Sequence, residues 1–314
     1  MTPHSLHWRT AHSQDYDSFS QFLQNHEPYL VAAASRFRAF RERSTKTSLP
    51  GRNHILIGMD NLNHIQSFIF RSGQILHPFF LDYDAERAQR VLRRFINLPF
   101  SKRIYSLQGL EQDVKIAEQA LEQEGYRIQD QFDYYLMQLD TPVLKPPQPE
   151  GLTLIELAAI GRTSIKQASI RQVSIEGALA GHAVADLLYP LQAAYEQEEV
   201  IPAHSTFNQA SCRRGLAKIL SEETIVYAAY EGLPVAKANT NATAYRYKQI
   251  GGVYVQPEFR GRGIASSVVG TLLARIQQQG YGVSLFVKKR NLPAIRLYER
   301  LGFVTIGSYR IVYY

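Results

Sequence analysis

The sequence predicts an α/β (α+β) protein built from two tandem domains. The chain has 314 residues, about twice the length of a typical single domain. Strand-like and helix-like segments follow each other in the same succession in both halves. A proline-rich stretch, PVLKPPQP at residues 142–149, separates the halves and is expected to be stiff and extended. We therefore expect a first domain at residues 1–140, a linker at 141–150 and a second domain at 151–314.

Apolar periodicity and turn residues predict the elements of the first half. Strand segments are rich in β-branched and aromatic residues, whereas helical segments repeat apolar residues every three or four positions. The expected helices are Gln14–Phe22, Tyr29–Phe40, Ala85–Ile96 and Gln112–Gln123, and the expected strands are His54–Met59, Ile65–Arg71, Ile75–Phe80, Arg103–Leu107 and Tyr126–Leu139.

The second half is predicted to open with a strand at Gly151–Glu156 and to continue with helices in the region 160–220. A hairpin and two further strands follow these helices. The expected helices in this region include Leu188–Glu199 and Ser211–Leu220, and the expected later strands are Ile225–Tyr230, Val235–Asn239, Gln249–Val255 and Val283–Val287.

The strand Gln249–Val255 begins the stretch around which the second half is organised. Gly251 and Gly252 remove two side chains from its middle, which predicts a bulge or a backbone lying close by. Arg260–Ala265 (RGRGIA) then lead into a helix. In this order the N–H groups of the turn and of the first helical turn converge where the macrodipole favours negative charge. The stretch therefore predicts a pyrophosphate site, with Arg260 and Arg262 at its rim.

A further helix begins near this site. Asn291 is placed to cap it, and Pro293 is tolerated in a first helical turn. Tyr298 lies on the apolar stripe of this helix, which ends at Gly302. A basic triplet precedes the helix at Lys288, Lys289 and Arg290. We expect this triplet either to attract the phosphate groups of a ligand or to be plain surface charge.

These two motifs resemble those of the GNAT superfamily of acyl-CoA-dependent N-acyltransferases. Arg260-x-x-Gly263-x-Ala265 is similar to the family's pyrophosphate loop, Gln/Arg-x-x-Gly-x-Gly/Ala. A later family element is matched at every fixed position by Asn291-x-x-Ala294-x-x-Leu297-Tyr298-x-x-x-Gly302-Phe303. The resemblance covers about residues 150–314. It implies two tandem GNAT-like domains, each with a mixed, mostly antiparallel central sheet flanked by helices.

The resemblance also implies the chemistry of an N-acetyltransferase. Acetyl-CoA would be the co-substrate, an amine would attack its thioester directly, and Tyr298 would protonate the departing thiolate. An alkyl amine has a pKa of about 10.4, so a base must first accept a proton from it. The sequence leaves Glu198, Glu199, His204 and water open as that base. The residues expected to bind the co-substrate are Val253, Tyr254, Val255, Arg260, Gly261, Arg262, Gly263, Ile264, Ala265, Ser266 and Asn291.

The first half lacks these features. Alignment of Gly125-Tyr126 on Gly302-Phe303 places Val114 at the position of Asn291 and Leu121 at that of Tyr298. Instead of a glycine-rich turn it has FFLDYD, which contains Asp82 and Asp84. We therefore expect residues 1–140 to be a degenerate GNAT-like domain without a CoA site.

Composition narrows the function classes. The formal net charge is +7, but no nucleic-acid-binding module accompanies the basic residues, and Arg36–Arg43 is expected to be a solvated helix end. Cys212 is the only cysteine, so a disulfide is excluded; we expect it to be incidental. His4 and His7 share a metal-like spacing in an expected frayed tail, and we expect no metal. No apolar run of about 18 residues and no apolar leader is present, which predicts a cytoplasmic protein without a membrane partner.

Three functions fit these features. The first is an acetyl-CoA-dependent N-acetyltransferase acting on a small-molecule or peptide amine. The second is a non-catalytic acyl-CoA sensor, against which Tyr298 argues. The third is a tandem-domain aminoacyl transferase using charged tRNA, which the pI of about 9.3 would suit but the pyrophosphate loop argues against. The sequence does not distinguish a monomer from a homodimer, nor does it define the acyl chain beyond acetyl.

Overall fold

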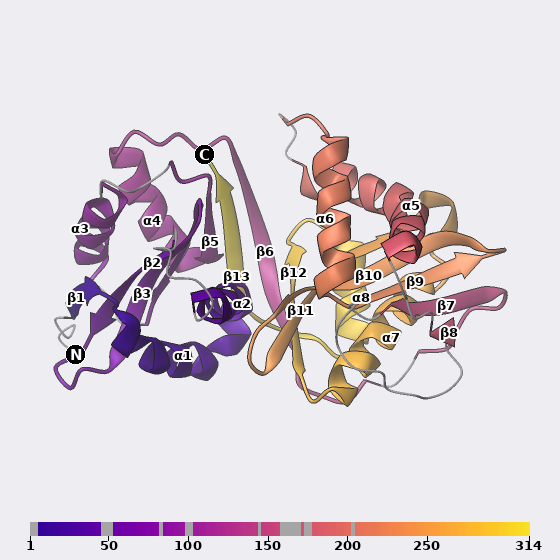
Figure 1. Ribbon diagram of the computed structural model, residues 1–314, viewed down its shortest axis with the longest axis horizontal. Helices are drawn as coiled ribbons and strands as arrows, with labels where there is room; N and C mark the ends of the chain where they lie inside the picture. Colours follow the sequence, from indigo (N-terminus) through magenta and orange to yellow (C-terminus); the bar gives the residue numbers. More distant parts are fainter. Residues whose placement is uncertain are drawn as a thin grey trace.

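The computed structural model describes residues 6–44, 53–81, 84–97, 103–143, 146–157, 171–172, 178–201 and 205–314. Within these residues the strands form one continuous sheet of thirteen strands, and helices cover parts of both faces (Figure 1). The strand order is β1-β2-β3-β4-β5-β13-β6-β12-β11-β10-β9-β7-β8. Neighbouring strands run antiparallel except in three pairs, β4 with β5, β11 with β12, and β7 with β8.

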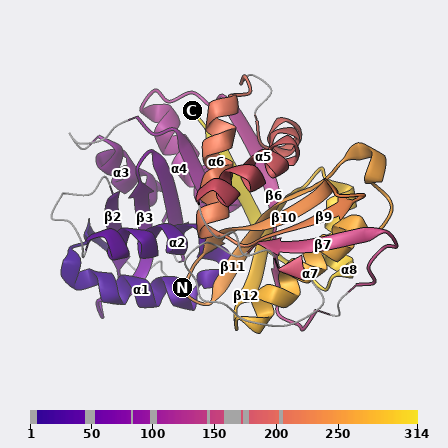
Figure 2. The same ribbon diagram turned by 45° about the vertical axis from the view of Figure 1, so that its right-hand side comes forward.

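The first half places two pairs of helices on opposite faces of its strands. Helices α1 and α2 enclose one apolar core, which contains Phe19 and Phe68, and α3 and α4 enclose another, which contains Leu92 and Leu121. Figure 2 shows α1 and α2 side by side on one face. The elements are β1 (His7–Thr10), η1 (Ser13–Asp15), α1 (Tyr16–Asn25), α2 (Glu27–Ser44), β2 (Asn53–Met59), β3 (Ile65–Ser72), β4 (Ile75–Phe80), α3 (Ala85–Ile96), β5 (Ser106–Leu110), α4 (Glu111–Gln123) and β6 (Asp130–Leu139).

The second half repeats this layering. Helices α7 and α8 pack on one face around Leu272 and Leu285, whereas α5 and α6 pack on the other around Leu188 and Leu216. The elements are β7 (Leu152–Leu157), β8 (Arg171–Gln172), α5 (Ala178–Tyr195), the π-helical η2 (Glu196–Val200), α6 (Gln209–Glu222), β9 (Ile225–Tyr230), β10 (Leu233–Thr243), β11 (Tyr247–Val255), η3 (Pro257–Phe259), α7 (Ile264–Gln278), β12 (Gly282–Lys288), α8 (Leu292–Arg300) and β13 (Val304–Tyr313).

Each half contains one parallel pair of strands that separates along its length. In the first half β4 and β5 pair only over Ile75–Leu76 and Ser106–Leu107. In the second half β11 and β12 pair over Tyr247–Ile250 and Gly282–Leu285, and the rest of β11 has no pairing with β12. The repetition confirms the predicted fold class of two similar α/β halves, each with a mixed, mostly antiparallel sheet.

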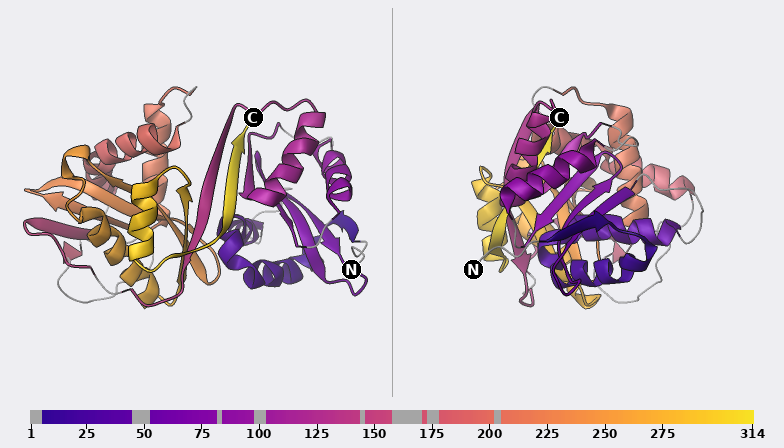
Figure 3. Two further views of the ribbon diagram at one scale, coloured as in Figure 1. Left: turned by 180° about the vertical axis from the view of Figure 1, so that it is seen from behind. Right: turned by 90° about the vertical axis from the view of Figure 1, so that its left-hand side faces the viewer.

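The two halves exchange their last strands. β6 follows the elements of the first half, but it lies between β12 and β13. β13 follows the elements of the second half, but it lies between β5 and β6. Figure 3 shows these two long strands side by side at the centre of the molecule. Because each strand is paired on both edges, the sheet runs through the junction without a break.

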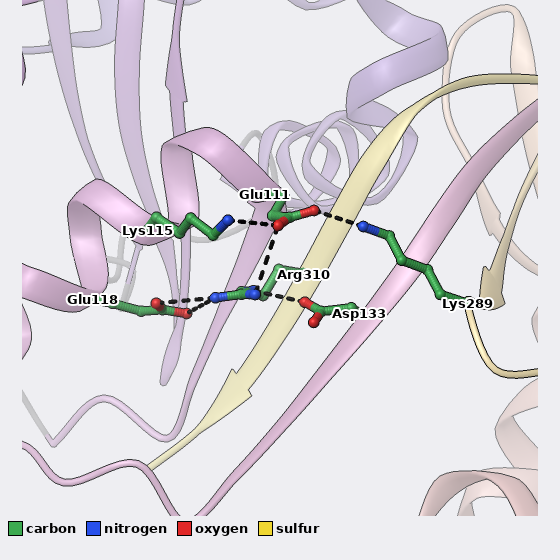
Figure 4. Close-up of polar contacts among 6 residues, drawn as sticks. All are labelled: Glu111, Lys115, Glu118, Asp133, Lys289 and Arg310. Carbon is green, nitrogen blue, oxygen red and sulfur yellow. Dashed lines mark hydrogen bonds and ion pairs between the residues drawn. The ribbon is translucent and has the colours of Figure 1, made fainter.

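Ion pairs reinforce this junction (Figure 4). Arg310 on β13 binds Asp133 on β6 at 2.7 Å and Glu118 on α4 at 3.3 Å. Glu111, at the start of α4, accepts hydrogen bonds from Lys115 and from Lys289 of the second half, both at 2.7 Å. These two lysines lower the pKa of Glu111 to about 2. The charged groups therefore join α4, β6 and β13 to the end of β12.

Helix α2 of the first half also contacts the second half. The buried carboxylate of Glu27 accepts hydrogen bonds from the backbone N–H groups of Tyr245, Arg246 and Tyr247, at 2.7–3.0 Å. Arg38 donates to the Ala244 carbonyl. The expectation that Arg36–Arg43 is a solvated helix end is therefore wrong, because the side chain of Arg38 reaches the β10–β11 hairpin of the second half.

The described part of the proline-rich linker lies against helix α7. The Val143 N–H donates to Gln277 at 3.0 Å, and the Ser267 hydroxyl donates to the Pro147 carbonyl at 3.0 Å. Pro146 packs so closely on Gly270 that a Cβ at this glycine would clash with it. The linker is thus held by side chains of the second half.

Several element boundaries differ from those predicted. The expected strand at Arg103 begins only at Ser106, and the expected helix Leu188–Glu199 is the end of α5, which begins at Ala178, followed by η2. His7 begins β1 and pairs with Met59, so it does not belong to a frayed tail. His4 and most of the region 158–177 lie outside the described residues.

Candidate active site

The pairing of β11 with β10 changes register beside the two glycines of β11. The register shifts between Lys237 and Asn239 and again between Thr240 and Ala242. A Cβ at Gly252 would clash with Asn239, and one at Gly251 would clash with Asn241. Gly252 also has a φ of +59°, which disfavours other residues. The expected bulge is found in β11, where Gly252 and Val253 lie opposite the single residue Ala238. Asparagine side chains rather than a second backbone make the close approach.

The predicted thioester-binding residues lie just beyond this point. Tyr254 pairs with Lys237 and Val255 pairs with Ala236, so one edge of β11 stays in the sheet. The other edge of β11 is no longer paired with β12 beyond Ile250, because the last parallel pair is Ile250 with Leu285. Val253–Val255 therefore present one edge that no part of β12 occupies.

The predicted pyrophosphate loop connects β11 to α7 through η3. Gly261 and Gly263 have φ values of +79° and +76°, and Gly263 is the N-cap of α7. No side chain caps this helix, so the N–H groups of its first turn are left without a side-chain acceptor. Ile264 is buried in the core, whereas Ala265 and Ser266 are half-buried. The backbone geometry suits an anion at this helix end.

Arg260 is engaged with a carboxylate. Its guanidinium binds both oxygens of Glu198, at 2.9 and 2.8 Å, and its Nε donates to the Val255 carbonyl at 3.0 Å. The hydrogen bond with Glu198 raises the pKa of Arg260. Arg262 is exposed and lies 5.4 Å from the ring centre of Phe259. Of the two expected rim arginines, Arg260 is therefore already paired.

Glu198 belongs to a segment that spans the open ends of β11 and β12. Tyr195, at the end of α5, is hydrogen-bonded to the Gly252 backbone. Glu199 binds Lys288 at 3.2 Å and accepts a hydrogen bond from Asn291 at 3.2 Å. Residues 195–199 thus contact β11, the loop after it, and the loop after β12. Both candidate carboxylate bases are ion-paired, and the third candidate, His204, lies outside the described residues.

Asn291 and Tyr298 both lie on or next to α8. The Asn291 side chain caps the helix by accepting from the Ala294 N–H at 3.2 Å. Tyr298 is buried, with its ring 5.7 Å from that of Phe303 in an edge-on arrangement. Burial and, to a lesser degree, the charges of Tyr195 and Glu199 raise the pKa of Tyr298. Its phenol is therefore protonated at neutral pH and can donate.

Two of the three residues of the basic triplet 288–290 form ion pairs, so the triplet is not plain surface charge. Lys288 binds Glu199 and Lys289 binds Glu111, whereas Arg290 is exposed. Neither lysine is free to attract a phosphate in this arrangement.

A comparison with protein families identifies this region. Residues 226–312 match the family model described as FR47-like protein. This range contains the glycine pair, the loop, Asn291 and Tyr298. Residues 226–312 therefore form an FR47-like domain of the GNAT family.

Relatives of this GNAT domain include a mycothiol acetyltransferase from Brachybacterium faecium. It is 34% identical over 89 residues, which are 28% of this chain and 25% of that protein. The chain thus matches about a quarter of the length of this curated relative.

Solved structures resemble the entire chain. A Drosophila protein has a TM-score of 0.65 at 9% identity, with 99% of each chain covered. A tandem GNAT protein from the clavulanic acid biosynthesis pathway has a TM-score of 0.52 at 14% identity, covering 98% of this chain and 97% of that one. At these identities the likeness concerns the fold alone, and it extends over both halves of the chain.

The first half differs from the GNAT domain at the corresponding helix. α3 is capped by Asp84, whose side chain accepts from the Arg87 N–H at 3.2 Å. Val114 and Leu121, which align with Asn291 and Tyr298, are buried apolar residues. Asp82 lies outside the described residues.

Sequence reasoning missed three residues next to the glycine pair. Tyr195, Lys237 and Asn239 all lie within reach of Gly252. The signal for Lys237 was a charged residue inside the apolar strand segment VAKAN. Cys212 is also buried nearby, in α6, where it contacts Glu196, so it is not isolated from the site.

No group of three or more His, Cys, Asp or Glu side chains suited to a metal occurs among the residues that the structure describes. None of the described helices is both long enough and apolar enough to cross a bilayer.

Proposed function

We propose that the chain is an N-acetyltransferase that moves the acetyl group of acetyl-CoA to an amine. The observation that supports this most is the uncapped start of α7, behind Gly261 and Gly263, next to the free edge of Val253–Val255. A diphosphate suits the helix start, and an extended pantetheine arm suits the strand edge. Asn291 and Ser266 lie at the starts of the two helices beside this path.

The residues present suit a direct transfer. The amine nitrogen attacks the thioester carbon, the C–S bond breaks, and the leaving thiolate takes a proton from Tyr298. A cationic acceptor must lose one proton before it attacks and a second from the same nitrogen once the C–N bond has formed; this second proton balances the one that Tyr298 gives to the thiolate. Glu199 is the better placed of the two carboxylates to take the first proton, because its charge reaches both Tyr195 and Tyr298. Both carboxylate oxygens of Glu198 accept hydrogen bonds from one guanidinium nitrogen of Arg260.

Acceptor binding is proposed for the side of the sheet that carries α5 and η2. Here Glu196, Glu198 and Glu199 lie in one five-residue segment, which favours a cationic amine. The mycothiol acetyltransferase name of the relative is compatible with a small-molecule acceptor.

Mass spectrometry of the purified protein with acetyl-CoA and a panel of amino acids, amino sugars, polyamines and peptides tests the proposal. We expect one acceptor class to gain a single acetyl group with release of CoA. Binding of acetyl-CoA without any transfer would favour a sensor. Transfer from a charged tRNA in the absence of acetyl-CoA would favour the aminoacyl transferase, and neither binding nor transfer would refute acetyl-CoA dependence.

A further inference from the structure

Lys237 is a fully buried cation at the point where β11 leaves β12. Only 1% of this residue is exposed. Its Nζ donates to Asn239 Oδ1 and to the Gly252 carbonyl, both at 3.0 Å. A buried ammonium group loses its hydration, so it persists only where other groups replace the lost hydrogen bonds. Lys237 therefore does not act as an ordinary strand residue.

Side chains from α5, η2 and α6 lie near this ammonium. The ring of Tyr195, from α5, lies 5.0 Å from Nζ. The carboxylate of Glu196, from η2, and the thiol of Cys212, from α6, also interact with this ammonium. Glu196 accepts a hydrogen bond from Gln192 at 2.8 Å. Burial lowers the pKa of Lys237 to about 7, while Glu196 and Cys212 oppose the shift. Neutral pH thus lies within its titration range.

Gly252 is held from two sides. The Lys237 ammonium binds its carbonyl, and the Tyr195 phenol is hydrogen-bonded to its backbone. Asn239, the second partner of Lys237, occupies the space where a Cβ at Gly252 would lie. These contacts together maintain the positive φ of Gly252. Gly252 lies two residues after Ile250, the last residue of β11 that pairs with β12.

We propose that Lys237 is a positioning residue for acyl transfer, which fixes Gly252 so that Val253–Val255 diverge from β12 and present their backbone to the thioester. This inference rests on the proposed function. Lys237 touches neither substrate in this role. It acts through the carbonyl of Gly252, and Tyr195 also contacts the backbone of this residue.

Lys248 offers a matched control for a Lys237→Met variant. It is a second buried lysine, on the adjacent strand β11, with its Nζ bonded to Gln279 at 2.6 Å and 4.9 Å from the ring of Tyr281. Lys237→Met and Lys248→Met therefore remove the same kind of charge and retain a similar side-chain length. Only Lys237 contacts Gly252.

The test compares kcat/KM at pH 6.5 for the wild type and both variants. A displacement of about 1 Å at a reacting group can cost about 10²-fold, so we expect a loss of that order in Lys237→Met and less than about a twofold change in Lys248→Met. The ratio of wild type to Lys237→Met should shrink as the pH rises above about 7, where wild-type Lys237 loses its proton. A purely structural lysine would show no such pH dependence.

Tyr195→Phe provides a second variant if Lys237→Met does not fold. It keeps the ring beneath the ammonium and removes only the hydroxyl bonded to Gly252, and we expect about a tenfold loss of kcat/KM. Equal activity of Lys237→Met and Lys248→Met, or an unaffected Tyr195→Phe, would overturn the inference while leaving the proposed function intact. A wild type that neither binds nor uses acetyl-CoA would instead refute the proposed function.

Discussion

Burial shifts the pKa in opposite directions for two polar side chains of the candidate site, Tyr298 and Lys237. It raises the pKa of Tyr298, so the phenol keeps its proton, and it lowers the pKa of Lys237 to about 7, so the ammonium is easily lost. The tyrosine is thereby suited to donate a proton, whereas the lysine holds a carbonyl more strongly while it is charged than after it has lost its proton.

Tyr298→Phe tests the first of these roles. The variant retains the ring packing and removes the donor, so kcat should fall by about 10²–10⁴-fold while the Kd for acetyl-CoA changes little. Tyr309→Phe is the matched control, because Tyr309 is equally buried but stacks on Phe286 at 3.9 Å, away from α8. Normal turnover in Tyr298→Phe with lowered thermal stability would show that the residue is structural.

Lys237 also makes stability depend on pH. Its pKa falls from 10.5 in the unfolded chain to about 7 in the folded protein. Between these values the unfolded state binds the extra proton, so the free energy of unfolding should rise with pH, by at most about 1.4 kcal/mol per unit. Denaturant unfolding at pH 7, 8 and 9 should show this rise in the wild type but not in Lys237→Met. Parallel curves would contradict it.

Residue spacing predicted the positions of the loop, the cap and Tyr298 in the chain, because these depend on local backbone geometry. It could not predict the partners of Arg260 or Lys288. Glu198 is 62 residues from Arg260, and Glu199 is 89 residues from Lys288. Such pairs depend on how α5 ends, which no local pattern specifies.

At the scale of single elements, strongly periodic segments were predicted well and short or irregular ones were not. α3 was expected at Ala85–Ile96 and is found there, because Asp84 caps it and its apolar residues form a clear stripe. β1 has only four residues, HWRT, and was missed. The π-helical η2 was predicted as ordinary helix, since its sequence lacks any helix breaker before Pro202.

Gly263→Val tests the helix start. The side chain would occupy the space in front of the N–H groups, so the Kd for acetyl-CoA should rise at least tenfold, equivalent to the loss of one charge-assisted hydrogen bond of about 1.5–3 kcal/mol. Gly280→Val, beyond the other end of α7, is the control because Gly280 has a φ of +79° and open space around it. Both variants carry similar backbone strain, so an equal Kd in the two would show that the loop does not bind the pyrophosphate.

At the scale of the molecule, the exchange of β6 and β13 was invisible to sequence reasoning. Each strand pairs on both sides with strands far away in the chain, and apolar alternation says nothing of such partners. The sequence predicted two consecutive domains. The observed sheet makes each half depend on a strand that belongs to the other.

Separate expression of residues 1–140 and 141–314 measures this dependence. The second fragment lacks β6, so the facing edges of β12 and β13 would be unpaired, and we expect it to aggregate. Co-expression of both fragments should restore a soluble complex that binds acetyl-CoA. A soluble, monomeric 141–314 fragment with the affinity of the full chain would contradict the prediction.

We further propose that the full chain binds one CoA. The start of α3 is already occupied by the Asp84 carboxylate, whereas α7 has no side-chain cap, so a diphosphate would be repelled in the first half. Calorimetric titration should give one equivalent per chain. Two equivalents per chain would show that the first half holds a site.

The exchanged strands also set the order in which the protein can be completed during synthesis. Ribosomes add about 5–20 residues per second, and N-terminal domains usually fold first. Here β5 must wait for β13, which is translated after every other strand. Until then the nascent first half has an open strand edge, and β6 lacks its neighbour β13. The nascent chain is therefore expected to need protection from premature pairing until β13 leaves the ribosome.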